Sequence, residues 1–240
     1  MQVLSNGWHV PDEDEKMFNH VKGDKTKNSP NYEKRQRLVI EQEHPNKKTF
    51  LDVGANIGVW SLAMEKQFDN VIAFEPSTKN LECLRLNWDG EIREFAVGDV
   101  NSTVVFKDSA KNCGNGKVRL DLSTEGSAYE VEMVTLDDQN ITDCSLIKID
   151  VQGFELFVVD GCEKILSDID VIILEVSFYQ FAEGAPQFCD IIEYMKSIDF
   201  VPYDITSGYY RPIDNALGQV DIFFVKEKSS FRKIHSWYEI

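Results

Sequence analysis

The segment LDVGANIGVW, residues 51–60, constrains the fold more than any other part of the sequence. Two glycines, Gly54 and Gly58, follow an apolar run directly and precede residues with a helical pattern. A glycine inside a regular element costs about 0.5–1 kcal/mol relative to alanine, so it is kept where the backbone turns sharply or approaches another group closely. The segment therefore predicts a buried strand that ends in a tight turn and leads into a helix.

The chain around this turn alternates between strand-like and helix-like patterns. Strands are predicted at 49–54, 71–76, 93–100, 145–153 and 169–177, and helices at 56–68, 77–88, 154–166 and 186–200. This order predicts an α/β fold, a doubly wound and mostly parallel sheet with helices on both faces. Short antiparallel strands are expected near 101–135, inserted at one edge of the sheet, and three more strands at 200–205, 209–213 and 220–227.

Composition fits one globular domain with a short extension, because 42% of the 240 residues are hydrophobic and 28% are charged. No apolar run approaches the roughly 18 residues of a transmembrane helix, so no membrane span is expected. The first residues lack the basic start and apolar core of a signal peptide. Five scattered cysteines without a CxxC pair argue against a disulfide framework and a structural zinc site. We therefore expect a cytoplasmic protein.

Net charge narrows the range of partners. At −16, the surface repels the phosphates of nucleic acids at long range. Nucleic acid is therefore a disfavoured partner, and a small-molecule or glycan ligand is favoured. The sequence leaves open whether the chain forms a homodimer.

An acidic residue follows the glycine turn about 20 positions later in the sequence. Glu75 ends the second predicted strand, 75 − 54 = 21 positions after Gly54. In nucleotide-binding α/β folds an acidic residue about 20 positions on binds ribose hydroxyls, and the helix N-terminus after the turn attracts polar or anionic groups. The alternatives are a ligand-free turn and a surface glutamate that caps the next helix. Taken together, the turn and Glu75 favour a nucleoside site.

A third polar cluster ends the apolar strand of the segment KIDVQGFE, residues 148–155. Asp150 and Glu155 belong to it, and Glu175 ends the next strand at the same edge, where open α/β sheets bind ligands. These carboxylates could bind a hydroxyl, an amine or a metal, or could complement a helix dipole. Since no third metal ligand joins Asp150 and Glu175, we expect no metal.

The motifs DVGANIG, FEPS, FAVGD and IKIDVQGFE together resemble the FkbM family of S-adenosylmethionine-dependent methyltransferases. The resemblance covers roughly residues 50–225. It implies a class I methyltransferase, Rossmann-like fold whose last strand, VDIFFVKE, is antiparallel. It also implies a domain at 49–228, with an N-terminal arm and helix at 1–48 and a C-terminal tail at 229–240.

The resemblance also assigns roles to individual residues. S-adenosyl-L-methionine would be bound by Asp52, Val53, Gly54, Ala55, Asn56, Gly58, Glu75, Pro76, Ser77, Val97, Gly98 and Asp150. Glu75 would bind the ribose hydroxyls, and Val97 and Gly98 would flank the adenine. Asp150 is expected to act as the catalytic base or to orient the acceptor, with Glu155 as the second choice, because none of the four histidines lies in a motif.

The favoured activity is O-methylation of a sugar or small-molecule hydroxyl. An NAD-dependent dehydrogenase is disfavoured, because Asn56 stands where a dinucleotide site needs a second glycine for close approach to the pyrophosphate. An RNA methyltransferase is disfavoured by the net charge. A non-catalytic nucleoside-binding module stays open.

Overall fold

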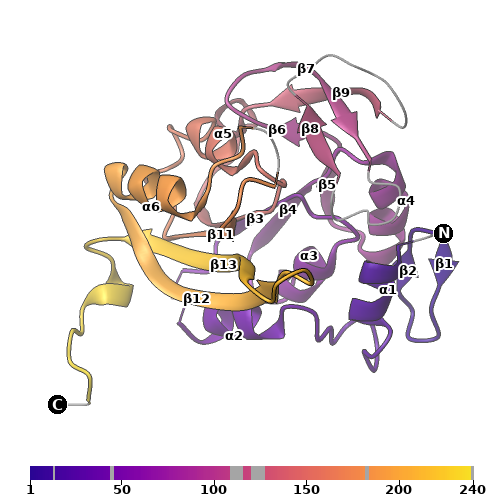
Figure 1. The fold of residues 1–240 in the computed structure, drawn as a ribbon, viewed down its shortest axis with the longest axis horizontal. Coiled ribbons are helices and arrows are strands. Elements are labelled where there is room, and N and C mark those ends of the chain that lie inside the picture. The colour runs from indigo at the N-terminus through magenta and orange to yellow at the C-terminus, as the bar shows by residue number, and fades with distance from the viewer. Residues whose placement is uncertain (13, 44–45, 109–115, 120–127, 182–183, 239–240) are drawn as a thin grey trace.

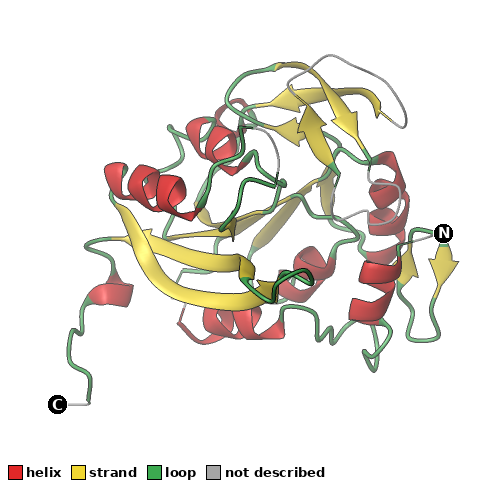
Figure 2. Ribbon diagram, in the orientation of Figure 1, coloured by secondary structure: helices red, strands yellow, loops and turns green. Residues whose placement is uncertain are grey.

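The computed structural model describes residues 1–12, 14–43, 46–108, 116–119, 128–181 and 184–238. A seven-stranded sheet forms the centre of the molecule (Figures 1 and 2). In spatial order its strands are β12 (Phe200–Tyr210), β13 (Leu217–Lys226), β11 (Val171–Ser177), β10 (Cys144–Ile149), β3 (Thr49–Val53), β4 (Asn70–Phe74) and β5 (Glu91–Arg93). Strand β13 is antiparallel to both neighbours, whereas β11, β10, β3, β4 and β5 pair in parallel. The predicted mostly parallel sheet with an antiparallel last strand is confirmed.

Helices cover both faces of this sheet, as predicted. One face carries α2 (Lys34–Glu43), α3 (Val59–Met64) and α4 (Thr78–Asn87), and the other carries α5 (Glu155–Asp160) and α6 (Phe188–Ser197) (Figure 1). Side chains alternate along β3, so Phe50 packs with Trp60 and Phe68 on the first face while Leu51 belongs to the core of the second. Both β3 and β10 are buried along their whole length, which explains why apolar residues point to both faces in each of them.

The structure corrects the strand predicted at 93–100. The chain divides there into β5, at the edge of the main sheet, and β6 (Ala96–Val97), which starts a second sheet. The second sheet has the order β6, β9 (Ala128–Val134), β7 (Ser102–Lys107) and β8 (Lys117–Arg119). The strands expected as an insertion at the edge of the main sheet therefore form a separate sheet. The parts of that predicted region at 109–115 and 120–127 lie outside the described residues.

The end of the chain also differs from the prediction of three strands. A single strand, β12, runs from Phe200 to Tyr210 and pairs with β13, with register shifts near Pro202 and between Thr206 and Tyr209. These shifts let one strand continue through Gly208, so the separately predicted segments 200–205 and 209–213 are joined as far as Tyr210. The short helix η3 (Ser230–Arg232) follows, and the chain then leaves the body of the molecule (Figure 1).

The N-terminal segment packs against α3 and α4. It contains the two-stranded hairpin of β1 (Gln2–Val3) and β2 (His9–Val10), followed by α1 (Glu15–Val21). Trp8 is fully buried and its indole N–H donates to Asp24 at 3.0 Å. Asn87 of α4 accepts from the His9 N–H at 2.8 Å and donates to the His9 carbonyl at 2.9 Å. Separate domain boundaries at 48/49 and 228/229 stay a prediction.

Candidate active site

Both glycines of the opening motif adopt left-handed backbone angles, and both lie against other parts of the chain. Gly54 has φ +83°, and a Cβ there would lie 2.0 Å from the carbonyl oxygen of Asp150. Gly58, the N-cap of α3, has φ +85°, and its Cβ would lie 2.5 Å from Leu84 of α4. The first glycine therefore lets the ends of β3 and β10 approach each other, and the second lets α4 pack on α3.

Asn56 and Glu75 meet at the end of this turn. The Asn56 backbone N–H donates to Glu75 Oε2 at 2.7 Å, and the Ser77 N–H donates to Glu75 Oε1 at 2.8 Å. Asn80 Nδ2 adds a longer bond to Oε1 at 3.3 Å. Burial raises the pKa of Glu75 to about 7, although these hydrogen bonds favour its charged form. The Asn56 side-chain oxygen is buried and has no hydrogen-bond partner among the described residues.

An open cavity begins at this turn, and the empty space in it is about 790 Å³ when the solvent at its opening is included. One end is lined by the glycine turn and Glu75, with Phe95, Ala96, Val97, Phe106 and Val118 as an apolar wall. The other end is lined by Asp150, Gln152 and Glu175. Lys16, Met17 and Tyr32 come to the lining from the N-terminal segment. The cavity lies at the carboxyl ends of the parallel strands, as expected for an open α/β sheet.

A buried ion pair holds Asp150 at the second end of the cavity. The Lys148 ammonium lies 3.0 Å from Asp150 Oδ2 and 5.7 Å from the centre of the Trp60 ring. Burial opposes the charged form of Lys148, but Asp150, Glu33, Asp52 and Asp221 overcome it and raise the lysine pKa. Burial likewise opposes the charge of Asp150, and Lys148 nevertheless lowers the pKa of that carboxyl. Asp150 is therefore ionised at neutral pH.

The side-chain amide of Gln152 connects Asp150 to Glu175. Gln152 Nε2 donates to Asp150 Oδ1 at 2.9 Å and to Glu175 Oε2 at 2.6 Å. Gln219 of β13 donates to the same Glu175 oxygen at 3.0 Å. Burial, followed by the nearby negative charge of Asp150, raises the pKa of Glu175 well above its ordinary value. The cavity end thus contains one ionised carboxylate and one that favours its neutral form.

The structure brings seven of the predicted site residues into the cavity lining: Val53, Gly54, Asn56, Glu75, Pro76, Val97 and Asp150. The others lie behind it. Asp52 is buried and accepts from Ser61 Oγ at 2.6 Å, and Ala55 packs among Leu84 and Trp88. Gly58 lies against α4, and Ser77 donates its hydroxyl to Asp108 at 2.7 Å.

Gly98 and Glu155 also lie outside the lining. A Cβ on Gly98 would lie 2.5 Å from Met133 Sδ, so this glycine allows close packing between the second sheet and the body. Glu155 is turned back onto its own loop, where both carboxylate oxygens accept from the Gly153 N–H at 2.9 and 3.1 Å. Burial raises the pKa of Glu155 to about 7. Its role as the alternative catalytic base stays a prediction, and Glu155 does not line the cavity.

Sequence reasoning missed the lining residues of the N-terminal segment and the second sheet. Lys16, Met17, Tyr32 and Phe106 belong to no motif, and only folding brings them to the cavity. Gln152 stood inside a quoted motif, and its position between Asp150 and Glu175 was a signal that could have been used.

The FkbM methyltransferase domain model matches residues 52–202, more than half of the chain. The chain belongs to the FkbM methyltransferase family. The matched region includes the glycine turn, Glu75, Asp150 and Glu175, and leaves the N-terminal segment and β13 outside. The dehydrogenase alternative has no support in this assignment.

A curated relative of this FkbM-family chain is the hexuronic acid methyltransferase AglP of Haloferax volcanii. The two are 28% identical over 149 residues, which cover 58% of this chain and 60% of AglP. The chain thus matches less than two thirds of that relative's length.

Two solved structures are similar to this FkbM-family chain. An S-adenosylmethionine-dependent methyltransferase of Clostridium acetobutylicum is 10% identical with a TM-score of 0.50, covering 81% of this chain and 92% of its own. The methyltransferase FkbM of Methylobacillus flagellatus is 18% identical with a TM-score of 0.47, covering 74% and 44%. The first likeness, with the strand order, shows the class I methyltransferase fold.

Two further observations concern the whole described part of the chain. Its helices include none that is long and apolar enough to cross a membrane. Its His, Cys, Asp and Glu side chains form no group of three or more that could hold a metal ion.

Proposed function

We propose that this chain is an S-adenosylmethionine-dependent methyltransferase that methylates a hydroxyl group of a sugar or another small molecule. The observation that carries the proposal is the continuity of one cavity from the FkbM glycine turn and Glu75 to the ionised Asp150. A sugar is favoured as acceptor by the relative AglP, which is named a hexuronic acid methyltransferase.

The residues at the first end of the cavity fit the cofactor. Asn56 presents a buried amide oxygen without a partner among the described residues, an acceptor suited to the amine of an amino-acid tail. Glu75 Oε2 accepts one backbone bond, from Asn56, and keeps a lone pair for a hydroxyl, whereas Oε1 already accepts from the Ser77 N–H at 2.8 Å and from Asn80 at 3.3 Å. The apolar wall around Phe95 and Val97 suits a flat base.

S-adenosylmethionine supplies a methyl group activated by its positive sulfonium. Asp150 binds the acceptor hydroxyl and takes up its proton, because Lys148 keeps this carboxyl ionised. Gln152 fixes the orientation of Asp150 by bonding it to Glu175. A positioned base contributes typically 10²–10⁴-fold, and correct orientation of the two reactants contributes more.

The net charge of the chain supports a small acceptor. The net charge of −16 disfavours nucleic acid and with it the alternative of an RNA methyltransferase.

Cytoplasmic localisation belongs to this proposal, supported by free thiols at Cys83, Cys144, Cys162 and Cys189. Homodimer formation is open and is tested by the mass of the protein in solution.

The test combines binding with turnover. Calorimetry should show binding of S-adenosylhomocysteine and none of NAD. Formation of S-adenosylhomocysteine from S-adenosylmethionine should then require one of a panel of hexoses, uronic acids and glycosides. Turnover only with an RNA oligomer would replace the sugar acceptor by RNA. Cofactor binding without turnover on any acceptor would favour a non-catalytic module, and absence of cofactor binding would refute the proposal.

A further inference from the structure

Acidic side chains outnumber basic ones along the cavity. Three carboxyl groups, those of Glu75, Asp150 and Glu175, line it, whereas Lys16 is the one basic side chain among the described residues of the lining. Lys16 comes from α1, outside the region matched by the family model. It therefore belongs to the part of the cavity that lies outside the region matched by the family model.

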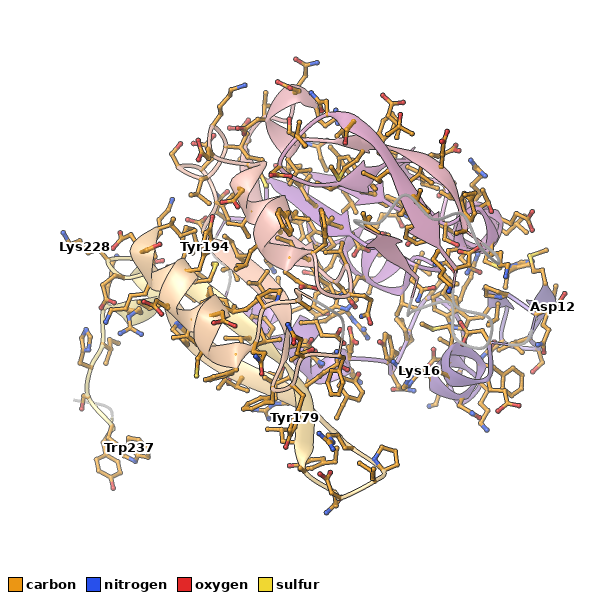
Figure 3. All side chains as sticks on the ribbon, turned by 45° about the horizontal axis from the view of Figure 1, so that its top comes forward. Asp12, Lys16, Tyr179, Tyr194, Lys228 and Trp237 are labelled. Carbon is orange, nitrogen blue, oxygen red and sulfur yellow. The ribbon has the colours of Figure 1, made fainter. Side chains whose placement is uncertain are left out.

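Lys16 lines the cavity from α1 and faces β12. Its ammonium is 5.6 Å from the centre of the ring of Tyr209, a residue of β12. Figure 3 shows Lys16 extending from α1 toward the body of the molecule, while Asp12 lies on the outer side. Lys16 thus contacts β12 at Tyr209, which pairs with Gln219 of β13, the residue that donates to Glu175.

No carboxylate of the described residues lies within ion-pair distance of the Lys16 ammonium. The negative charge of Asp150 is already paired with Lys148 at 3.0 Å. Glu175 shares its oxygen Oε2 between the amides of Gln152 and Gln219. The positive charge of Lys16 is therefore not offset by a dedicated partner at the acceptor end.

We propose that Lys16 binds a carboxylate of the acceptor and so selects an acidic sugar over a neutral one. The inference rests on the proposed function, because it places the acceptor at the Asp150 end of the cavity. An ammonium can donate up to three hydrogen bonds to a carboxylate, and such charged bonds are about twice as strong as neutral ones. The acceptor hydroxyl would then lie toward Asp150 and its carboxylate toward Lys16.

The experiment compares two acceptors on the full chain that differ only at C6, the methyl glycoside of glucuronic acid, which carries a carboxylate there, and methyl glucoside, which carries a neutral hydroxymethyl group. The variants are Lys16→Met, which keeps the stem and removes the charge, and Lys16→Arg, which keeps the charge. Lys22→Met is the matched control, because Lys22 is an exposed lysine directly after α1 and does not line the cavity. Binding of each sugar to the enzyme saturated with S-adenosylhomocysteine is measured by NMR titration, and methyl transfer is measured separately.

We expect Lys16→Met to weaken glucuronide binding and raise its KM by roughly fivefold, because Lys16 is exposed and an exposed ion pair contributes up to about 1 kcal/mol. Glucoside binding and kcat should stay within about twofold, Lys16→Arg should recover most of the loss, and Lys22→Met should match the parent. Equal effects of Lys16→Met on both sugars, or no glucuronide binding by the parent, would overturn the inference. Glucuronide binding that depends on Lys16 but leads to no methyl transfer would instead sustain it and contradict the proposed function.

Discussion

Replacing Lys148 by methionine tests whether the buried ion pair controls Asp150. The lysine side chain is 6% exposed and that of Asp150 is 23% exposed. Removal of one partner from a buried pair costs about 3–5 kcal/mol, because the other charge stays buried without compensation. Since Asp150 retains some access to water, we expect a loss near the lower end, about 3 kcal/mol of unfolding free energy at pH 7.

The pH at which the pair acts follows from the directions of the two pKa shifts. The folded protein lowers the pKa of Asp150 and raises that of Lys148. The contribution of the pair is therefore complete above the ordinary aspartate pKa, about 3.9, and below that of lysine, about 10.4. It is lost as the pH falls through the folded pKa of Asp150 or rises through that of Lys148.

The assay is a double-mutant cycle read by chemical denaturation and by the pH profile of methyl transfer. The variant Lys148→Met with Asp150→Asn removes both charges, so it should lose less stability than the sum of the single variants. In Lys148→Met the acidic limb of the rate profile should move to higher pH, because Asp150 loses the charge that lowers its pKa. Lys164→Met, which breaks an exposed pair with Asp138, should be nearly neutral. Additive losses together with an unmoved acidic limb would refute our account of the pair.

Three further predictions concern the cavity. Glu75→Ala should weaken S-adenosylhomocysteine roughly 10- to 100-fold in calorimetry, since a charged hydrogen bond contributes about 1.5–3 kcal/mol, and unchanged affinity in a folded variant would remove Glu75 from the site. Gly54→Val should fold poorly or lose the cofactor, because the side chain would meet the Asp150 carbonyl at φ +83°; normal affinity would show that the turn is only structural. Asp150→Asn should lower methyl transfer by about 10² or more while cofactor affinity falls less than about tenfold, and untouched turnover would exclude this end of the cavity as the acceptor site.

A fourth prediction, for the same cavity, uses the raised pKa of Glu75. Between the ordinary value of 4.5 and the folded value of about 7, Glu75 binds more protons in the folded state than in the unfolded state, so its own contribution to the unfolding free energy of the cofactor-free protein should fall by about 3 kcal/mol over that interval. Glu75→Gln should flatten this part of the stability profile, and an equally steep profile in the variant would contradict the assignment.

That Gly54 and Glu75 lie at one end of the cavity could be predicted, because each stands at the end of a buried strand in the sequence. Neighbouring parallel strands bring such ends together. The same rule predicts Asp150 and Glu175 at one edge, and β10 and β11 do pair in parallel.

The lining residues of the N-terminal segment could not be predicted, because contacts between segments far apart in the sequence bring them to the cavity. Lys16 and Tyr32 reach the cavity because Trp8 and Asn87 hold the N-terminal segment in place. Trp8 bonds Asp24 within the segment and Asn87 bonds the segment to α4. Neither contact gives the sequence a periodic pattern of apolar residues. Glu155 shows the limit of motif reasoning, because its position in the motif predicts a catalytic base whereas its side chain does not line the cavity. The left-handed backbone of Gln152 and Gly153 turns the loop so that Glu155 accepts from the Gly153 N–H.

The position of β13 has a consequence for the order in which the chain can fold during synthesis. Strand β12 is made first, yet it reaches the sheet only through β13, which lies between β12 and β11. Until residue 226 has left the ribosome, the edge of β11 is unpaired and open to other nascent strands. Completion of the sheet therefore waits for the last strand, and mutations in β13 should reveal themselves first as aggregation during expression.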